Sequence, residues 1–275
     1  MRLFLATLAV LVAFAANSVL TRAGLADGAI APAAFAAIRL ASGALVLGAI
    51  VALRGAAPWR GGSAGGAASL LAYAVLFSFA YVAIPAGLGA LILFGAVQVT
   101  MFAGAILRGE RPGARRWIGS GLGLAGLAVL GVPGAGAPPG WAAGCMALAG
   151  VAWGLYSLIG ARAGDATRAT AGNFLWAAPV TLILWALVGG GTSVAGVALA
   201  VASGAVASGL GYAAWYAVLP RLDASVAALA QLTVPLIALA GGMAFLGEAP
   251  DLRFAIASVL ILGGVGLGLM RKKLP

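Results

Sequence analysis

Apolar runs of about 20 residues follow one another along almost the whole chain, separated by short breaks of glycine, proline or charge. A helix needs a run of that length to cross the hydrocarbon core of a bilayer. Hydrophobic residues make up 63% of the sequence and charged residues 8%, so a water-exposed surface could not be covered with polar groups. We therefore expect an all-α membrane protein with lipid as its solvent.

The breaks predict ten transmembrane helices. The weakest break, at residues 85–87, divides an apolar run that is twice as long as one span. The first run begins directly after Arg2, where a cleaved signal peptide is the competing interpretation. We expect a span there because no soluble segment follows the run. The expected ranges are 3–22, 31–53, 64–84, 87–107, 115–132, 139–161, 169–189, 195–219, 224–246 and 252–270.

Basic residues gather on one side of these spans. With the N-terminus inside, thirteen of the 16 Lys and Arg residues lie at cytoplasmic ends, whereas Arg22 and Arg253 lie on the opposite side and Arg39 lies within a span. The positive-inside rule then places both termini in the cytoplasm. Because this topology accounts for the net charge of +10, we expect no nucleic-acid partner.

A short motif occurs twice. Leu107-Arg108-Gly109-Glu110 and Leu246-Gly247-Glu248 place their glutamates 248 − 110 = 138 residues apart, about half of the 275-residue chain. Five spans in each half would make the second half enter the membrane inverted, as in many secondary transporters. We expect repeats at 1–132 and 139–275, joined by a loop at 133–138. Each glutamate is expected to cap the helix that follows it.

The ionisable residues exclude several kinds of chemistry. A single cysteine, Cys145, and no histidine rule out an internal disulfide and a Cys/His metal site, so we expect no metal and no cofactor. All six acidic residues fall in loops or at span ends, whereas proton-coupled carriers usually hold a carboxylate or histidine within the membrane. This favours facilitated diffusion over proton exchange or cationic-drug antiport. With no nucleophile–base pair, we do not expect an enzyme.

Two polar residues lie deep within the first two spans. Asn17 shares a helical face with Thr7, Phe14 and Thr21, and either contacts a substrate or hydrogen-bonds helices together. Arg39 carries a guanidinium group that suits a substrate carboxylate with paired donors. The alternative for Arg39 is that its side chain extends to the interface or binds backbone carbonyls.

Aromatic residues cluster in the third, sixth, seventh and eighth spans, and further amides and hydroxyls lie nearby. Rings with a polar edge suit an amphipathic solute such as an aromatic amino acid, although an interfacial belt or helix packing is the alternative. Tyr81, Tyr216 and Trp59 lie near span ends and fit the belt. Besides Asn17 and Arg39, the cavity candidates are Phe77, Tyr81, Gln98, Trp153, Tyr156, Asn173, Trp176, Ser208, Tyr212, Trp215, Gln231 and Thr233.

Glycines four residues apart allow helix backbones to approach closely in lipid. Gly119 with Gly123, and Gly264 with Gly268, have this spacing. They indicate either packing within the bundle or a dimer contact.

Short motifs lie along nearly the whole chain. They are 209–216 (GLGYAAWY), 229–235, Gly247-Glu248 and Gly263-Gly264 in the second half, Asn17, Arg39 and Gly109-Glu110 in the first, and 149–156 with Trp153 at the start of the second copy. Together they resemble the drug/metabolite transporter superfamily, and the EamA-type branch in particular. Within the branch the sequence is similar to the YddG-like exporters of aromatic and other amino acids. One departure is that Pro235 has no equivalent in the fourth span, where residues 97–99 read Val-Gln-Val.

The resemblance implies a ten-helix carrier with inverted five-helix repeats in the plasma (inner) membrane. Members export metabolites, amino acids or drugs, or move nucleotide sugars. Nucleotide sugars would need several buried basic residues, and the spans offer only Arg39. We therefore expect a monomeric exporter of small metabolites, foremost neutral and aromatic amino acids. A multidrug or other metabolite exporter is the alternative, and a membrane scaffold a more remote one.

Overall fold

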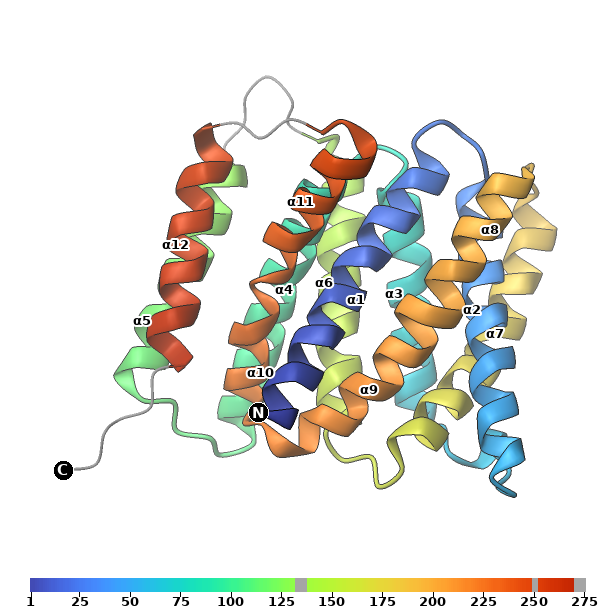
Figure 1. Ribbon diagram of the computed structural model, residues 1–275, viewed down its shortest axis with the longest axis horizontal. Helices are drawn as coiled ribbons and strands as arrows, with labels where there is room; N and C mark the ends of the chain where they lie inside the picture. The colour runs from blue at the N-terminus through green and yellow to red at the C-terminus, as the bar shows by residue number, and fades with distance from the viewer. Residues whose placement is uncertain (132–137, 249–251, 270–275) are drawn as a thin grey trace.

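The structure, a computed structural model, describes residues 1–131, 138–248 and 252–269. Most of the predicted 133–138 loop and the basic residues 271–273 lie outside this part. The described chain is helical, without strands, apart from an isolated bridge between Ile30 and Thr192. Figure 1 shows α1 (Arg2–Leu25), α2 (Pro32–Leu53), η1 (Pro58–Arg60), α3 (Ala64–Ala80), α4 (Ala86–Leu107), α5 (Ala114–Gly131), α6 (Gly140–Gly160), α7 (Ala166–Val188), α8 (Val194–Ala202), η2 (Ser203–Leu210), α9 (Gly211–Val218), η3 (Leu219–Arg221), α10 (Ala224–Gln231), α11 (Val234–Leu246) and α12 (Leu252–Leu269).

Seven helical segments in the described chain are long and apolar enough to cross a membrane. They are α1, α2, α4, α6, α7, the continuous stretch Val194–Arg221 and the stretch Ala224–Leu246. Helix α3 and residues Ala255–Leu269 of α12 form shorter apolar helices. Large apolar side chains such as Leu45, Leu187 and Val194 point outward and are at least 74% exposed, which fits a surface solvated by lipid.

The predicted weak break is confirmed, because α3 ends at Ala80 and α4 begins at Ala86. Proline precedes this start and limits the backbone to the extended conformation that enters a helix. Elsewhere side chains cap the helix starts. Ser63, Asp165 and Ser193 accept hydrogen bonds from backbone N–H groups three residues ahead, at 3.0–3.1 Å.

Two spans are interrupted near their middle. Between α8 and α9, residues Ser203–Leu210 form a π-helical turn, which is rare and often occurs at functional sites. Between α10 and α11, the helix breaks at residues 232–233, just before Pro235, which lacks a backbone donor. The first interruption places Ser203 and Ser208 against Asn17, and the second directly follows the buried Gln231.

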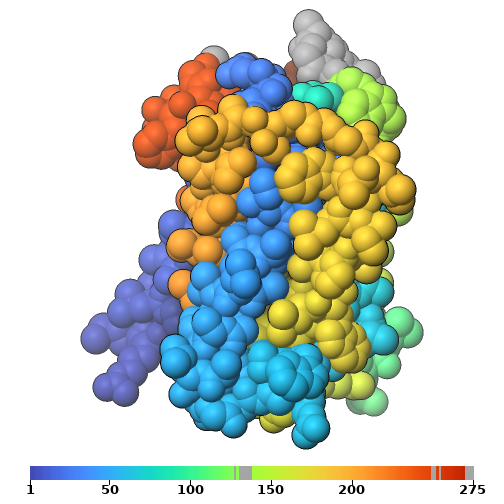
Figure 2. All heavy atoms as spheres, turned by 90° about the vertical axis from the view of Figure 1, so that its right-hand side faces the viewer, coloured from blue at the N-terminus to red at the C-terminus, as the bar shows by residue number. Residues whose placement is uncertain are grey.

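The helices form one main bundle with a pair at its edge. Helix α1 contacts α4, α9 and α11, and α6 packs against α3 and α4. Helix α2 runs between α7 and α8 on the face shown in Figure 2. Helices α5 and α12 lie side by side at the opposite edge (Figure 1).

The glycine pairs hold α5 against α12. A Cβ on Gly119 would meet the Gly264 carbonyl oxygen, and one on Gly264 would meet that of Gly119. Gly268 also approaches Gly119, so both predicted pairs serve packing within the chain. The dimer interpretation is not needed to explain them.

Glu110 and Glu248 each cap a helix of the other half. The Glu110 carboxylate accepts hydrogen bonds from the Ala224 and Ser225 backbone N–H groups, at 2.7 and 3.4 Å, where α10 begins. The Glu248 carboxylate accepts them from Ala86 and Gly87, at 2.6 and 3.4 Å, where α4 begins. A carboxylate at a helix start was the correct expectation, but the helix that follows each glutamate was the wrong partner.

Gly119→Ala should lower stability, since its methyl group would strike the Gly264 carbonyl; overpacking costs about 1–3 kcal/mol. Gly121→Ala is the matched control, because a Cβ there meets nothing within 4 Å and alanine favours a helix. We expect the melting temperature of the purified protein to fall by several degrees for the first variant only. Equal melting temperatures for both variants would contradict this packing.

Candidate functional site

Arg39 of α2 lies at the centre of the bundle, fully buried. Its Nε donates to the Ser208 hydroxyl at 2.9 Å, and its Nη2 donates to the hydroxyls of Tyr73 and Tyr212 at 3.0 and 2.5 Å. The guanidinium carbon lies 4.9 Å from the ring centroid of Tyr73 and 5.0 Å from that of Phe77. Arg39 therefore neither extends to the interface nor binds backbone carbonyls through its side chain.

Arg39 forms no salt bridge with an acidic side chain among the described residues. Arg116 and Asp223, which do form one, lie elsewhere in the chain. Its Nη1 atom is buried without a hydrogen-bond partner. A buried cation is costly unless paired, and an unsatisfied donor adds to that cost. Such an atom is suited to receive an anionic group that arrives from outside the chain.

Asn17 of α1 connects four segments. Its Nδ2 donates to the hydroxyls of Tyr73 and Tyr212, each at 3.0 Å. Its Oδ1 accepts from Ser203 at 2.5 Å and from Ser208 at 3.4 Å, both in the π-helical turn. The helix-bonding role expected as one alternative is thus present. Asn17 and Arg39 share the same two tyrosine hydroxyls.

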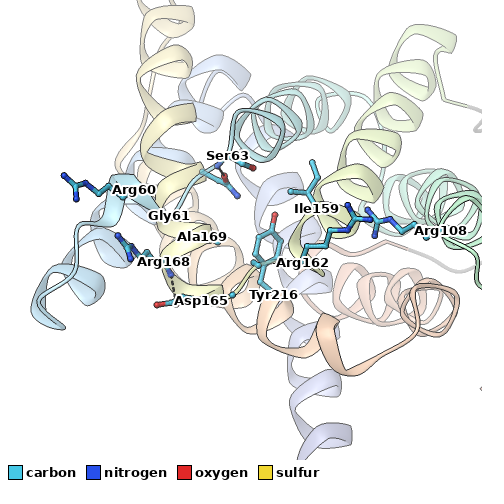
Figure 3. A pocket seen from close by; sticks show the side chains of 13 residues that line it. Arg60, Gly61, Ser63, Arg108, Ile159, Arg162, Asp165, Arg168, Ala169 and Tyr216 are labelled. Atoms are coloured by element: carbon cyan, nitrogen blue, oxygen red, sulfur yellow. Dashed lines mark hydrogen bonds between the residues drawn. The ribbon is translucent and has the colours of Figure 1, made fainter.

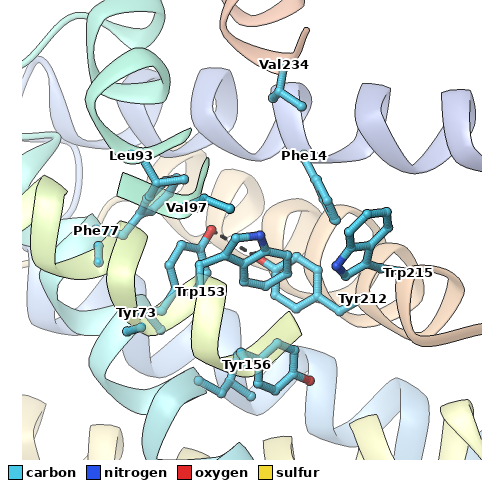
Figure 4. Packing of buried hydrophobic residues seen from close by; sticks show 14 of the residues in the cluster. Phe14, Tyr73, Phe77, Leu93, Val97, Trp153, Tyr156, Tyr212, Trp215 and Val234 are labelled. Atoms are coloured by element: carbon cyan, nitrogen blue, oxygen red, sulfur yellow. Dashed lines mark hydrogen bonds between the residues drawn. The ribbon is translucent and has the colours of Figure 1, made fainter. Parts of the chain in front are cut away.

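The Tyr73 and Tyr212 rings belong to a cluster of packed aromatic side chains, which Figure 4 shows. Trp153 of α6 lies 4.4 Å from the Tyr212 ring and 5.0 Å from the Tyr73 ring. Phe14 of α1 meets Trp153 edge-on at 5.1 Å, and Tyr156 packs against Trp153 at 5.4 Å. The cluster, here called the aromatic cage, joins elements from both halves of the chain.

The broken span α10–α11 contributes an amide to the cage. Trp153 Nε1 donates to Gln231 Oε1 at 2.8 Å, and Gln231 Nε2 points at the Met101 sulfur, 3.1 Å away. Gln231 is the last residue of α10, so the break at residues 232–233 follows directly. The interruption therefore begins directly after the residue that hydrogen-bonds Trp153.

Two other predicted cavity residues, Phe77 and Trp215, pack against the side chains described above. Phe77 packs between Arg39 and Tyr81, and Trp215 packs against Phe14. Trp215 Nε1 donates to Ser157, at 3.0 Å.

Four predicted residues are not brought to the cage. Gln98 donates to Ser120 at 2.8 Å, while its Oε1 lacks a partner. Thr233 bonds to its own helix, and Trp176 is 44% exposed. Asn173 accepts from the Ser63 backbone N–H at 3.0 Å, near one end of the bundle.

The belt interpretation is wrong for Tyr81 and Tyr216, which are 0% and 1% exposed. Tyr81 donates to the Ala86 carbonyl at 3.2 Å, and Tyr216 donates to the Tyr156 carbonyl at 3.0 Å. Trp59 is 59% exposed, as a belt residue would be.

The sequence prediction missed Tyr73 and Ser203. Tyr73 precedes Phe77 by four residues on α3, so helical spacing alone could have placed it on the same face. Ser203 could not have been found this way, because its position depends on the π-helical turn. Phe14 lay on the predicted face of the first span but was not among the cavity candidates.

A pocket of about 490 Å³ opens at the end of the bundle where α3 and α7 begin (Figure 3). Four arginines line it, and Tyr216 and Asn173 lie at its inner side. Partial burial, together with the nearby Arg162, lowers the pKa of Arg108. The lining arginines are Arg60, Arg108, Arg162 and Arg168.

A bundle of apolar helices of membrane-spanning length, with its polar side chains gathered at the centre, is typical of a multi-pass membrane protein. The model of the EamA-like transporter family matches residues 140–270. A Pseudomonas aeruginosa protein of uncharacterised function is 48% identical over 97% of this chain and 94% of its own length. The chain belongs to the EamA-like transporter family, within the drug/metabolite transporter superfamily.

Two further similarities, one to a sequence and one to a solved structure, support different conclusions. A Streptantibioticus cattleyicolor protein named "Probable terminal-alkyne amino-acid exporter" is 29% identical over 74% of this chain and 70% of its own length. A solved structure titled "Crystal structure of protein" superimposes with a TM-score of 0.78, at 22% identity, over 98% of this chain and 97% of that one. At that identity the solved structure supports the fold alone.

Trp153→Phe should destabilise the protein by about 1–3 kcal/mol, because it leaves the buried Gln231 oxygen without its donor. Adding Gln231→Leu should recover part of this loss, since the unpaired amide is then removed. Thermal unfolding of the two single variants and the double variant measures the coupling. Strictly additive losses would show that the hydrogen bond contributes nothing.

Proposed function

We propose that this protein is a transporter that exports amino acids, with Arg39 as the group that receives the substrate carboxylate. The observation that carries the proposal is the fully buried guanidinium, which has no acidic partner among the described residues and a free Nη1 donor. A carboxylate at Nη1 would supply both the missing counter-ion and the missing acceptor. The exporter name of the S. cattleyicolor relative supports the same substrate class.

The aromatic cage suits the remainder of an amino acid. Trp153, Tyr212 and Phe14 offer flat apolar walls for a side chain, and the Tyr73 hydroxyl and the Asn17 carboxamide offer polar contacts. The rings fill the centre in this structure, so a substrate enters only when they separate. Aromatic and other neutral side chains fit this lining better than charged ones.

Alternating access gives a route to that separation. The cage is built by α1, α2 and α3 from one half and by α6, α9 and α10 from the other. Rocking of one half against the other would open it to either side in turn. The two interrupted spans add the local freedom that such a change requires.

The membrane arrangement belongs to the same proposal. We infer ten spans in two inverted five-helix repeats, at 1–132 and 139–275, with both termini in the cytoplasm of a plasma (inner) membrane. The reciprocal capping by Glu110 and Glu248 supports the repeat, because each half supplies one carboxylate to the other. We infer a monomer that works without a cofactor.

Transport of L-phenylalanine into liposomes should depend on the guanidinium fork of Arg39. Arg39→Lys keeps the charge but loses the paired donors, so kcat/KM should fall at least about tenfold. Arg39→Met also removes the charge, so its kcat/KM should be lower still. Arg54→Gln is the control, because Arg54 is exposed at the end of α2 and should leave uptake unchanged. Full uptake by Arg39→Met would exclude the carboxylate role.

L-phenylalaninamide, which lacks the carboxylate, should be a poor substrate of the wild-type protein. Lack of uptake of every member of an aromatic and aliphatic amino-acid panel would contradict the proposed function. In that case, flux of drugs or other metabolites through the same liposomes would become the alternative.

Uptake should be insensitive to an imposed pH gradient at zero membrane potential. None of the described acidic residues is buried and the chain has no histidine, so no carboxylate or imidazole is available to bind a proton within the spans. Uptake is compared in potassium-clamped liposomes at equal pH and with one pH unit across the membrane. A rate that rises several-fold with the gradient would contradict facilitated diffusion.

A further inference from the structure

Four arginines line the pocket at the Arg60 end of the bundle. Arg60 and Arg168 lie on one side of its opening and Arg108 and Arg162 on the other, with Tyr216 between them (Figure 3). The guanidinium groups of Arg60, Arg108 and Arg162 make no hydrogen bond or ion pair with any described residue. Their charge is therefore available to an outside anion.

Two acidic residues lie near these arginines, Asp165 in the lining and Glu110 near Arg108, and both cap helices. The Asp165 carboxylate accepts the Arg168 backbone N–H at 3.0 Å and caps α7. Arg168 Nε donates to the Ala57 carbonyl at 3.2 Å, which fixes that side chain beside the opening. A concave opening lined by one sign of charge concentrates ions of the opposite sign.

A row of packed aromatic rings connects the inner side of this pocket to Trp153. Tyr216 lines the pocket, and its ring lies 4.7 Å from that of Tyr156. Tyr156 in turn packs 5.4 Å from Trp153. The side chains of Tyr216 and Tyr156 thus separate the charged opening from Trp153. The Tyr156 hydroxyl is buried, near the side chains of Asn173 and Thr170.

We propose that this pocket is the mouth through which the substrate reaches the aromatic cage, and that its arginines bind the substrate carboxylate before Arg39 does. The inference rests on the proposed function for the identity of the substrate. Tyr216 and Tyr156 form the inner barrier, held closed by the hydrogen bond from the Tyr216 hydroxyl to the Tyr156 carbonyl. The buried Tyr156 hydroxyl is the next polar group along this route.

Charged thiol reagents test the mouth independently of transport. Ala169→Cys in a Cys145→Ala background places one thiol in the pocket of the full-length protein. In nanodiscs, where both faces are accessible, it is treated with sulfonatoethyl or trimethylammonioethyl methanethiosulfonate. The reference thiol is Ala26→Cys, in a second pocket that holds Asp27 and Glu248 but a single arginine, Arg22.

At low ionic strength we expect the anionic-to-cationic rate ratio to be at least about tenfold higher for Ala169→Cys than for Ala26→Cys. In 1 M salt, where the Debye length is about 3 Å, the difference should shrink. Arg108→Gln with Arg162→Gln should lower the ratio several-fold. The control pair Arg2→Gln with Arg54→Gln removes the same charge from exposed sites outside the pocket and should leave the ratio unchanged.

Substrate protection then links the mouth to transport. Saturating L-phenylalanine should slow modification of the Ala169→Cys thiol several-fold, and L-phenylalaninamide should not. Equal ratios at the two thiols, or equal protection by acid and amide, would overturn the proposal while leaving amino-acid uptake by the wild-type protein intact. Failure of the wild-type protein to take up any amino acid would instead overturn the proposed function, and with it the carboxylate assigned to this mouth.

Discussion

The central constraint in this molecule is a single positive charge that the membrane cannot solvate. Arg39 is fully buried in a bundle surrounded by lipid, so protein groups must replace the water it has lost. They do so with hydroxyls from Tyr73, Tyr212 and Ser208, which come from α3, α9 and the π-helical turn. These segments, and the rings of Tyr73 and Phe77, together surround that charge.

The solvation is incomplete, and this gives the site its proposed role. Hydroxyls stabilise a guanidinium without neutralising it, and one nitrogen has no acceptor. A carboxylate in the chain would have satisfied both needs and closed the site to anions. The same logic holds at the opening lined by Arg60, Arg108 and Arg162, where charge is again left available. The inferred route thus runs from the arginines of this opening to Arg39 at the centre of the bundle.

Hydrophobic patterning predicted the positions of the helices because span length is set by the bilayer. It also predicted the deep polar residues, since a polar group inside an apolar run stands out. It could not predict that Ser203 and Ser208 meet Asn17, because a π-helical turn changes which side chains share a face. Nor could it show that Glu110 and Glu248 cap helices far away in sequence, because periodicity describes only local neighbours.

That exchange of caps has a consequence for how the chain is made. The first backbone N–H groups of α4 are satisfied by a carboxylate that is synthesised 162 residues after Ala86. During insertion, the start of α4 therefore cannot gain this cap until Glu248, just after α11, has been synthesised. The first half cannot reach its final state as an independent unit, and the two halves complete each other only near the end of synthesis.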